Sequence, residues 1–230
     1  MITGLKAEEQ HQHKNGGGWV ANTATVKDSV YIGANAQVYG NAQVYGNAQM
    51  SGNARVFGNV QVYGNAQVFG NAQVYGDAQV YDNAWVYGNA QVFGNAWVLG
   101  DAQMYGDAQV YDNAWVSGNA RVSGNAQVYG NAQVYGNAQM SGNARVFGNV
   151  QVYGNAQVYG DAWVETPLFI QGTKHGVSNS SYGKLSIGCI TLTFAEWKKQ
   201  YRSLGKCEGY TEKQIKEYGA IIALATKIGK

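Results

Sequence analysis

The chain of 230 residues is poor in several residue types that enzymes and secreted proteins commonly use. It has one proline, two cysteines and three histidines, and only 13% of its residues are charged. Two cysteines are too few for the disulfide framework of a small secreted domain, so we expect free thiols and a cytoplasmic protein. No run of 18 apolar residues occurs, so we expect no membrane-spanning helix and no membrane partner. The polar stretch from Met1 to Lys6 also lacks the apolar core of a signal peptide.

The abundant feature is a six-residue repeat of the form Ala-Gln-Val-Tyr-Gly-Asn. It runs in one register over 150 residues, or 25 hexads, from Ala24 to Thr173. Positions one and three are small and apolar, while positions two and four are mainly Gln and Tyr or Phe, which is the alternation of a strand with one buried face. Gly and Asn at positions five and six tolerate left-handed backbone angles, so each hexad predicts a four-residue strand and a corner with positive φ. Because such a strand cannot bury its face alone, the hexads should stack into a solenoid with a thin interior.

An internal duplication favours three hexads, or 18 residues, per coil. Residues 35–68 recur identically as residues 125–158, an offset of 90. This offset is a whole number of 18-residue coils but not of 12-residue coils. Trp97 and Trp115 also lie 18 residues apart. We therefore expect an all-β solenoid of about eight three-sided coils in which each residue stacks on the residue 18 positions away.

The hexads resemble those of the hexapeptide-repeat left-handed β-helix proteins, which have Ile or Val at the centre and small residues two places away. The Ala-x-Val-x-Gly-Asn form looks most like the YdcK-like β-solenoid repeats. This resemblance covers Trp19 to Thr173 and implies left-handed coils of three short parallel strands, an exception to the usual right-handed crossover. The flanks, His13 to Val20 and Leu185 to Trp197, resemble small bacteriophage and prophage proteins of unknown role. This resemblance implies a phage-encoded protein in a bacterial host cell, and it implies no known activity.

The sequence divides into an N-terminal segment (1–23), the solenoid (24–173) and a C-terminal module (174–230). Within the module, Thr193 with Glu196 and Thr211 with Gln214 both match a capping box, so two helices should begin there. Each helix has an apolar stripe at helical spacing. We expect this helical hairpin to cap the last coil or to contact a second copy, and a surface for another partner is the alternative.

Charge differs between the two parts of the chain. Residues 36–164 contain three Arg and six Asp, whereas residues 168–230 contain ten Lys or Arg and four Glu. A basic segment can contact nucleic acid or an acidic protein. A solvated helical surface is the simpler interpretation, so we do not expect a nucleic-acid partner.

One surface of the predicted solenoid is continuous in aromatic residues. Folding the sequence at 18 residues aligns seven rings, here called the aromatic column: Tyr39, Phe57, Tyr75, Phe93, Tyr111, Tyr129 and Phe147. The equivalent positions on the other two sides are interrupted, for example by Ser51 and Leu99. Stacked rings stabilise an in-register sheet, but a long aromatic strip is also more apolar surface than monomers usually expose. The aromatic column is therefore predicted either to stabilise the solenoid or to form an interface, and the sequence does not decide between these two roles.

We predict that the interaction surface consists of the aromatic column with Trp197 and Tyr201 of the helical module. The expected partners are a second copy of the chain and another protein. A phage-encoded scaffold that binds a host protein, with an anti-defence role, is the resulting hypothesis.

No catalytic, cofactor or metal site is predicted. Many left-handed β-helix proteins are CoA-dependent acyltransferases, so this class is the alternative function. Those enzymes resemble a solenoid interrupted by loops with a histidine base, but here the 25 hexads contain neither insertion nor histidine. His175 is the one plausible base, and His11 with His13 offers too few ligands for a structural metal site. Six corner aspartates could bind calcium weakly but share no 18-residue register: Asp77, Asp82, Asp101, Asp107, Asp112 and Asp161.

Overall fold

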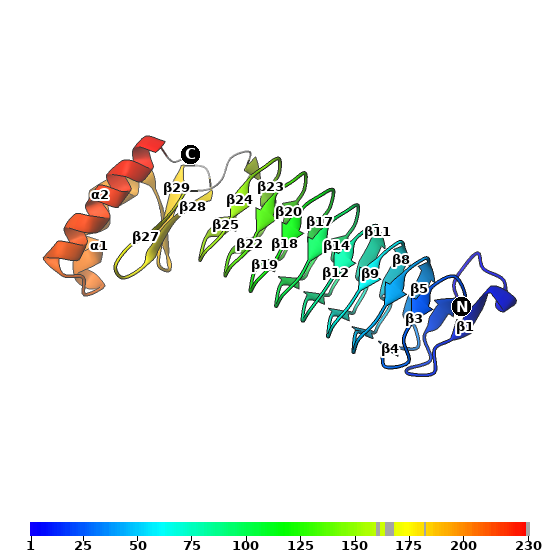
Figure 1. Ribbon diagram of the computed structural model, residues 1–230. Helices are drawn as coiled ribbons and strands as arrows, with labels where there is room; N and C mark the ends of the chain where they lie inside the picture. Colours follow the sequence, from blue (N-terminus) through cyan, green and yellow to red (C-terminus); the bar gives the residue numbers. More distant parts are fainter. Residues whose placement is uncertain (160–161, 164–167, 182, 229–230) are drawn as a thin grey trace.

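The computed structural model describes residues 1–159, 162–163, 168–181 and 183–228. Its larger part is a β-solenoid whose coils stack along one axis, with a separate module of strands and helices at the C-terminal end (Figure 1). The predicted fold class, a solenoid of parallel sheets followed by two helices, is confirmed.

Three sheets run along the solenoid. The first contains β1 (Gln10–Gln12), β2 (Trp19–Ala21), β5 (Gln37–Gly40), β8 (Arg55–Gly58), β11 (Gln73–Gly76), β14 (Gln91–Val92), β17 (Gln109–Val110), β20 (Gln127–Val128), β23 (Arg145–Val146) and β26 (Ala162–Trp163). The second contains β3 (Thr25–Val26), β6 (Gln43–Val44), β9 (Gln61–Val62), β12 (Gln79–Val80), β15 (Trp97–Val98), β18 (Trp115–Val116), β21 (Gln133–Val134) and β24 (Gln151–Val152). The third contains β4 (Tyr31–Ile32), β7 (Gln49–Met50), β10 (Gln67–Val68), β13 (Trp85–Val86), β16 (Gln103–Met104), β19 (Arg121–Val122), β22 (Gln139–Ser141) and β25 (Gln157–Tyr159).

The register of these sheets confirms the 18-residue coil. Gln73 pairs in parallel with Arg55 on one side and with Gln91 on the other, and Trp97 pairs with Trp115. Most strands are two residues long, shorter than the four residues that the hexad pattern predicts. The four-residue strands β5, β8 and β11 extend through the glycine at position five.

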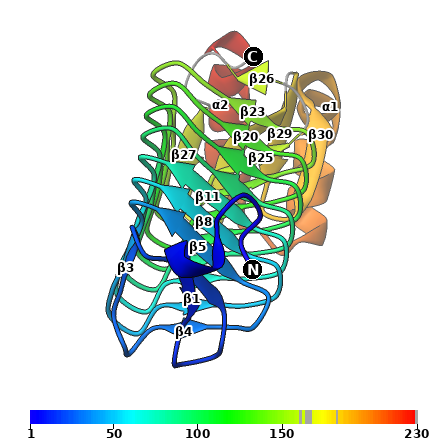
Figure 2. The same ribbon diagram turned by 90° about the vertical axis from the view of Figure 1, so that its right-hand side faces the viewer.

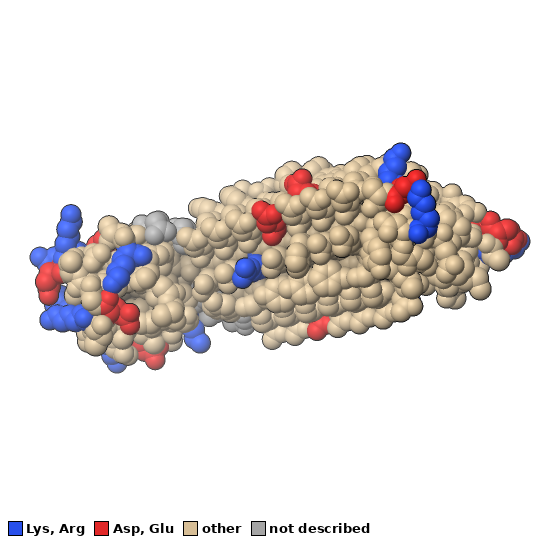
Figure 3. Space-filling model, turned by 90° about the horizontal axis from the view of Figure 1, so that it is seen from below, with Lys and Arg blue, Asp and Glu red and all other residues tan. Residues whose placement is uncertain are grey.

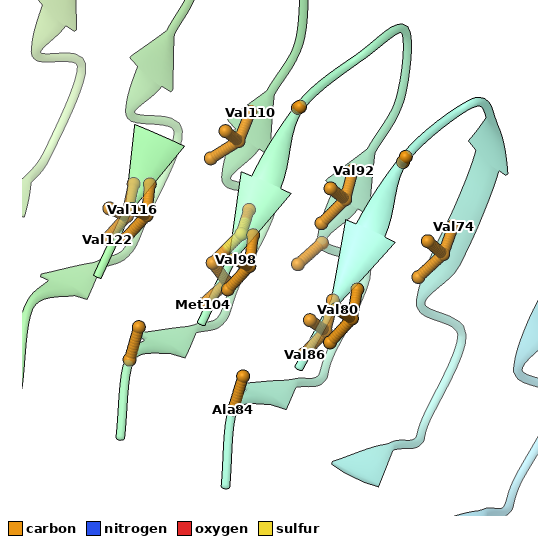
Figure 4. Packing of buried hydrophobic residues seen from close by; sticks show 14 of the residues in the cluster. Val74, Val80, Ala84, Val86, Val92, Val98, Met104, Val110, Val116 and Val122 are labelled. Atoms are coloured by element: carbon orange, nitrogen blue, oxygen red, sulfur yellow. The ribbon is translucent and has the colours of Figure 1, made fainter. Parts of the chain in front are cut away.

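The interior holds the residues at positions one and three of each hexad. From Ala36 to Val146 all of them have no exposed surface, and the branched side chains of successive coils lie directly above one another (Figure 4). Met50, Met104 and Met140 all point inward from the third sheet. Because position one carries only Ala or Val in these hexads, the interior has no room for a large side chain there, as expected for close packing.

The corners explain both the glycine and the asparagine of the repeat. From Gly40 to Gly154 every residue at position five has positive φ, for example +68° at Gly94. Asp82 and Asp112 replace glycine there and also have positive φ, 59°. At position six the expectation of positive φ is wrong, because no described Asn has a positive φ there. Asn uses its side chain instead: Asn53 Nδ2 donates to Asn71 Oδ1 at 3.0 Å, one coil further. These asparagine ladders tie the coils together along each corner.

The N-terminal segment covers the first coil. A short 3-10 helix (Ala7–Glu9) precedes β1, which pairs antiparallel with β2. The solenoid thus begins at Trp19, before the predicted boundary at residue 24. Glycines 16 and 18 lie against Ile32 so closely that a Cβ at either would collide with it. They serve close packing at this end of the solenoid.

The C-terminal module is more than the two predicted helices. A four-stranded antiparallel sheet comes first: β27 (Phe169–Gln171), β28 (Gly176–Ser181), β29 (Lys184–Ile187) and β30 (Ile190–Thr193). Helices α1 (Phe194–Cys207) and α2 (Glu212–Ile228) then follow, with Thr193 and Thr211 in the predicted capping boxes. Strand β27 lies within the predicted solenoid range 24–173, but it pairs with β28 of this module.

The sheet of the module, not its helices, faces the solenoid. Strand β28 lies next to β25 of the last coil, and both helices lie on the far side of the sheet (Figures 1 and 2). The helical hairpin therefore does not itself cover the last coil. A small core holds the module together, with Val177 and Leu185 from the sheet and Trp197 and Ile222 from the helices.

Candidate functional site

The aromatic column forms as predicted, along the first sheet. Its seven rings stack in sequence with centroids 4.8–5.1 Å apart and planes within 9° of parallel. All seven residues are half-buried. The stacking arises because position four projects outward at the same place in every coil, one strand spacing apart. Ring faces are covered by neighbouring rings, so the column presents ring edges and hydroxyl groups to the outside.

The surroundings of the aromatic column carry little charge. On the described strands from β5 to β23 of the first sheet, Arg55 and Arg145 are the only charged residues. On the face of the molecule seen in Figure 3, few charged side chains lie along the solenoid and many lie on the C-terminal module. Burial raises the pKa values of Tyr75 and Tyr111, so these hydroxyls stay neutral in the physiological range.

The other two faces are less regular. On the second sheet Trp97 and Trp115 stack at 4.8 Å, and Tyr81 donates its hydroxyl to Gln61 at 2.8 Å. On the third sheet Trp85 is 39% exposed and contacts Phe69 edge to face. Serine residues interrupt both columns, so neither provides a continuous aromatic strip. Their outward position agrees with the hexad pattern, because Trp85, Trp97 and Trp115 occupy position two, which alternates with the buried positions one and three.

The structure separates Trp197 and Tyr201 from the aromatic column. Trp197 is only 3% exposed, and its Nε1 donates to the Leu185 carbonyl at 2.8 Å. Its predicted place in an interaction surface is therefore corrected: it is a core residue of the module. Tyr201 is half-buried and packs against Gly219 across the two helices. Its main contact is within the hairpin.

The C-terminal module contains a second candidate site. A cavity of about 120 Å³ opens between the sheet and the two helices, and His175 is one of its lining residues. The His175 ring lies against Gly188 and 5.9 Å from the ring of Tyr210. Sequence reasoning considered His175 alone and missed Tyr210, because the two are 35 positions apart and only the packing of α2 on the sheet brings them together.

No metal centre forms among the residues that the structure describes, where no group of three His, Cys, Asp or Glu residues converges. His11 contacts Asn22, while His13 is buried and contacts the backbone of Asn15. Five of the six corner aspartates act as corner residues; for instance, Asp77 accepts a hydrogen bond from Asn59. Asp161 lies outside the described residues. In the described part of the chain no helix combines the length and the apolar character that crossing a bilayer requires.

The fold and its repeating surface define a parallel β-solenoid protein. Ten segments match the family model described as YdcK β-solenoid repeat: residues 36–51, 48–64, 60–76, 72–88, 78–92, 108–124, 114–130, 126–142, 138–154 and 150–166. Together they cover half of the chain, and the chain belongs to this family. No curated protein matches it.

Solved structures similar to this chain include two acyltransferases. The UDP-N-acetylglucosamine acyltransferase of Francisella novicida is 12% identical with a TM-score of 0.45, over 88% of this chain and 78% of that one. The UDP-N-acetylglucosamine O-acyltransferase (LpxA) of Moraxella catarrhalis RH4 is 13% identical with a TM-score of 0.41, over 92% and 83%. At these values neither bears on the activity of this chain.

Proposed function

We propose that the protein is a non-enzymatic scaffold that binds proteins through the aromatic column. Its partners are a second copy of the chain and, in line with the phage-like flanks, a protein of the bacterial host cytoplasm. The proposed host partner is a protein of a defence system, which would give the scaffold an anti-defence role. The observation that carries the proposal is the column itself: seven stacked, half-buried rings on a face with almost no charge.

The ring geometry favours a protein partner over a carbohydrate. A sugar stacks on the open face of a ring, but in the aromatic column the faces are covered by neighbouring rings about one strand spacing away. The exposed edges suit contact with apolar side chains. Such contact contributes ~25 cal/mol per Å² of apolar surface buried, with few charges to desolvate.

Acyl transfer is the competing function, and it requires a particular arrangement of catalytic base and cleft. A histidine base has to face a cleft that accepts the acyl donor. His175 lines a cavity, but it does so inside the C-terminal module, where Cys189 and Tyr210 are its polar neighbours. Incubation with acetyl-CoA and an amine or sugar acceptor tests this function. We expect no turnover, and His175→Ala should leave the biological activity intact. Turnover that His175→Ala abolishes would contradict the proposal.

Light scattering at micromolar concentration tests self-association. We expect an oligomer in the wild type and a shift to monomer in Tyr75→Lys/Phe93→Lys, because two ammonium groups would have to be desolvated in the interface. Tyr63→Lys, on the second sheet, is the matched control and should remain oligomeric. A monomeric wild type, or an oligomer indifferent to both lysines, would contradict the role of the aromatic column.

A milder variant separates loss of binding from loss of folding. Serine occurs naturally at position four of the repeat, at Ser117 for example, so Tyr75→Ser/Phe93→Ser should keep the fold. Its circular dichroism spectrum should match that of the wild type. Its oligomer should dissociate at a higher protein concentration than the wild-type oligomer does. For the host partner, lysate proteins captured by the wild type should be lost with this variant and retained with Tyr63→Ser.

A further inference from the structure

The cavity of the C-terminal module has mainly apolar walls. Ile187 and Ile190 contribute from the sheet side, and Leu204, Ile215 and Ile222 from the helices. Its volume of about 120 Å³ is close to the ~150 Å³ of an engineered apolar cavity that binds benzene. The space therefore suits one small ring.

Two aromatic rings and one free hydroxyl group lie among the residues that line this cavity. The Tyr210 ring lies 5.0 Å from that of Tyr218, tilted by 60°. The Tyr218 hydroxyl is already used, because it donates to the His175 carbonyl at 2.8 Å and accepts from the Lys174 amide at 3.0 Å. The Tyr210 hydroxyl has no hydrogen-bond partner among the described residues. It is thus available to a bound molecule.

We propose that this cavity binds a small, uncharged aromatic molecule with one hydroxyl or N–H group, about the size of phenol. The ring would pack on the isoleucine and leucine walls, and its polar group would reach the Tyr210 hydroxyl. This binding site is separate from the aromatic column and independent of the scaffold function.

The apolar walls of the cavity favour a neutral ligand, because a charged group would be desolvated among them. Lys174 Nζ lies 4.5 Å above the centre of the Tyr210 ring, and Glu208 is among the lining residues. Both charged side chains are exposed to solvent, so they do not offset the desolvation of a charge buried between the apolar walls. Burial, with further contributions from Tyr218 and Glu208, raises the pKa of Tyr210 to about 12. The same surroundings disfavour a negative charge on a ligand.

Two cysteines provide an internal control for a binding experiment. Cys189 and Cys207 are both free and exposed, but only Cys189 lines the cavity. Alkylation of the full chain with iodoacetamide, followed by mass spectrometry, reports on each thiol separately. Phenol at millimolar concentration should slow alkylation of Cys189 at least about fivefold and leave Cys207 unchanged, while benzoate should protect at least about tenfold more weakly. Equal effects on both cysteines, or none, would overturn the proposal.

Two variants test where the ligand binds. Leu204→Phe fills the cavity and should abolish protection of Cys189, whereas Leu224→Phe, at an exposed site on α2, should not. Tyr210→Phe keeps the ring, removes the hydroxyl and should weaken phenol binding by roughly fivefold, the effect of one hydrogen bond. Circular dichroism checks that each variant is folded. Protection that survives both Leu204→Phe and Tyr210→Phe in folded protein would place the ligand elsewhere and refute the proposal.

Discussion

In the solenoid, Val92 lies between Val74 and Val110, its own counterparts one coil before and one coil after. In the C-terminal module, Trp197 packs with Val177, Leu185 and Ile222, residues of different kinds from different elements. Every coil of the solenoid thus repeats one set of contacts with its neighbours, and stability is close to a sum over coils. The module has a single small core, so each of its core residues carries a large share of the stability.

The largest effect should come from truncating the core of the module. Trp197→Ala removes a buried indole and its hydrogen bond to Leu185, which should cost about 3–5 kcal/mol. Thermal unfolding followed by circular dichroism should show loss of the helical signal at lower temperature and an unchanged β-sheet transition. Trp85→Ala, at a 39% exposed site of the solenoid, should cost under ~1 kcal/mol. If both signals shifted together in Trp197→Ala, the two parts would unfold as one unit.

The corner glycines should show the next largest effect. Gly94 has φ +68°, and a Cβ there would lie 2.9 Å from the Asp112 nitrogen. Gly94→Val should therefore cost about 1–3 kcal/mol in denaturant unfolding, because a β-branched residue is disfavoured at positive φ. Gly94→Asp is the matched control, since Asp82 and Asp112 occupy equivalent positions, and it should cost less than Gly94→Val. Equal costs for the two variants would mean that the contact, and not the branched side chain, sets the penalty.

The asparagine ladders should contribute less at each position. Asn59 Nδ2 donates to Asp77 Oδ1 at 2.8 Å, so Asn59→Asp loses a donor and sets two carboxylates together. We expect a cost of roughly 0.5–1.5 kcal/mol. Asn155 accepts from Asn137 and donates to no described residue, so Asn155→Asp should be within about 0.5 kcal/mol of the wild type. Identical chemical denaturation curves for the two variants would contradict a stabilising role for the ladder.

The smallest expected effect is on alkaline unfolding of the module. Burial raises the pKa of Tyr210 from 10.0 to about 12. Between these values the unfolded chain has lost the phenolic proton while the folded chain keeps it, so stability falls as pH rises and is fully present below pH 10. Tyr210→Phe removes this term, and its unfolding midpoint should depend less steeply on pH in this window. A pH dependence equal to that of the wild type would show that Tyr210 does not contribute.

Sequence patterns predicted the solenoid well and the module only in part. The capping boxes at Thr193 and Thr211 located both helices. The four-stranded sheet was missed because β28, with the sequence Gly-Val-Ser-Asn-Ser-Ser, has a single large apolar residue, Val177. Strand β27 was assigned to the solenoid because Ile170 and Gly172 still fit the hexad register, although its pairing partner is β28.

The candidate site also has a part that the sequence predicted and a part that it did not. The aromatic column was predictable because residues 18 positions apart must meet once the coil length is known. The apolar stripe that contains Trp197 predicted a buried helical face, but it did not say whether another molecule or the protein's own sheet covers that face. In the structure the sheet of the module covers it.

The sequence alone determined the period, the thin Ala and Val interior, the glycine corners and the ladders of rings and amides. It did so because each of these contacts joins positions at one constant separation along the chain. The direction of coiling followed from family resemblance and not from the period. Only the tertiary structure decided which strand follows the last hexad, that the sheet faces the solenoid, and that His175, Cys189 and Tyr210 surround one cavity. Those contacts join residues whose separations along the sequence differ from one contact to the next. They therefore depend on how the whole non-repeating segment packs.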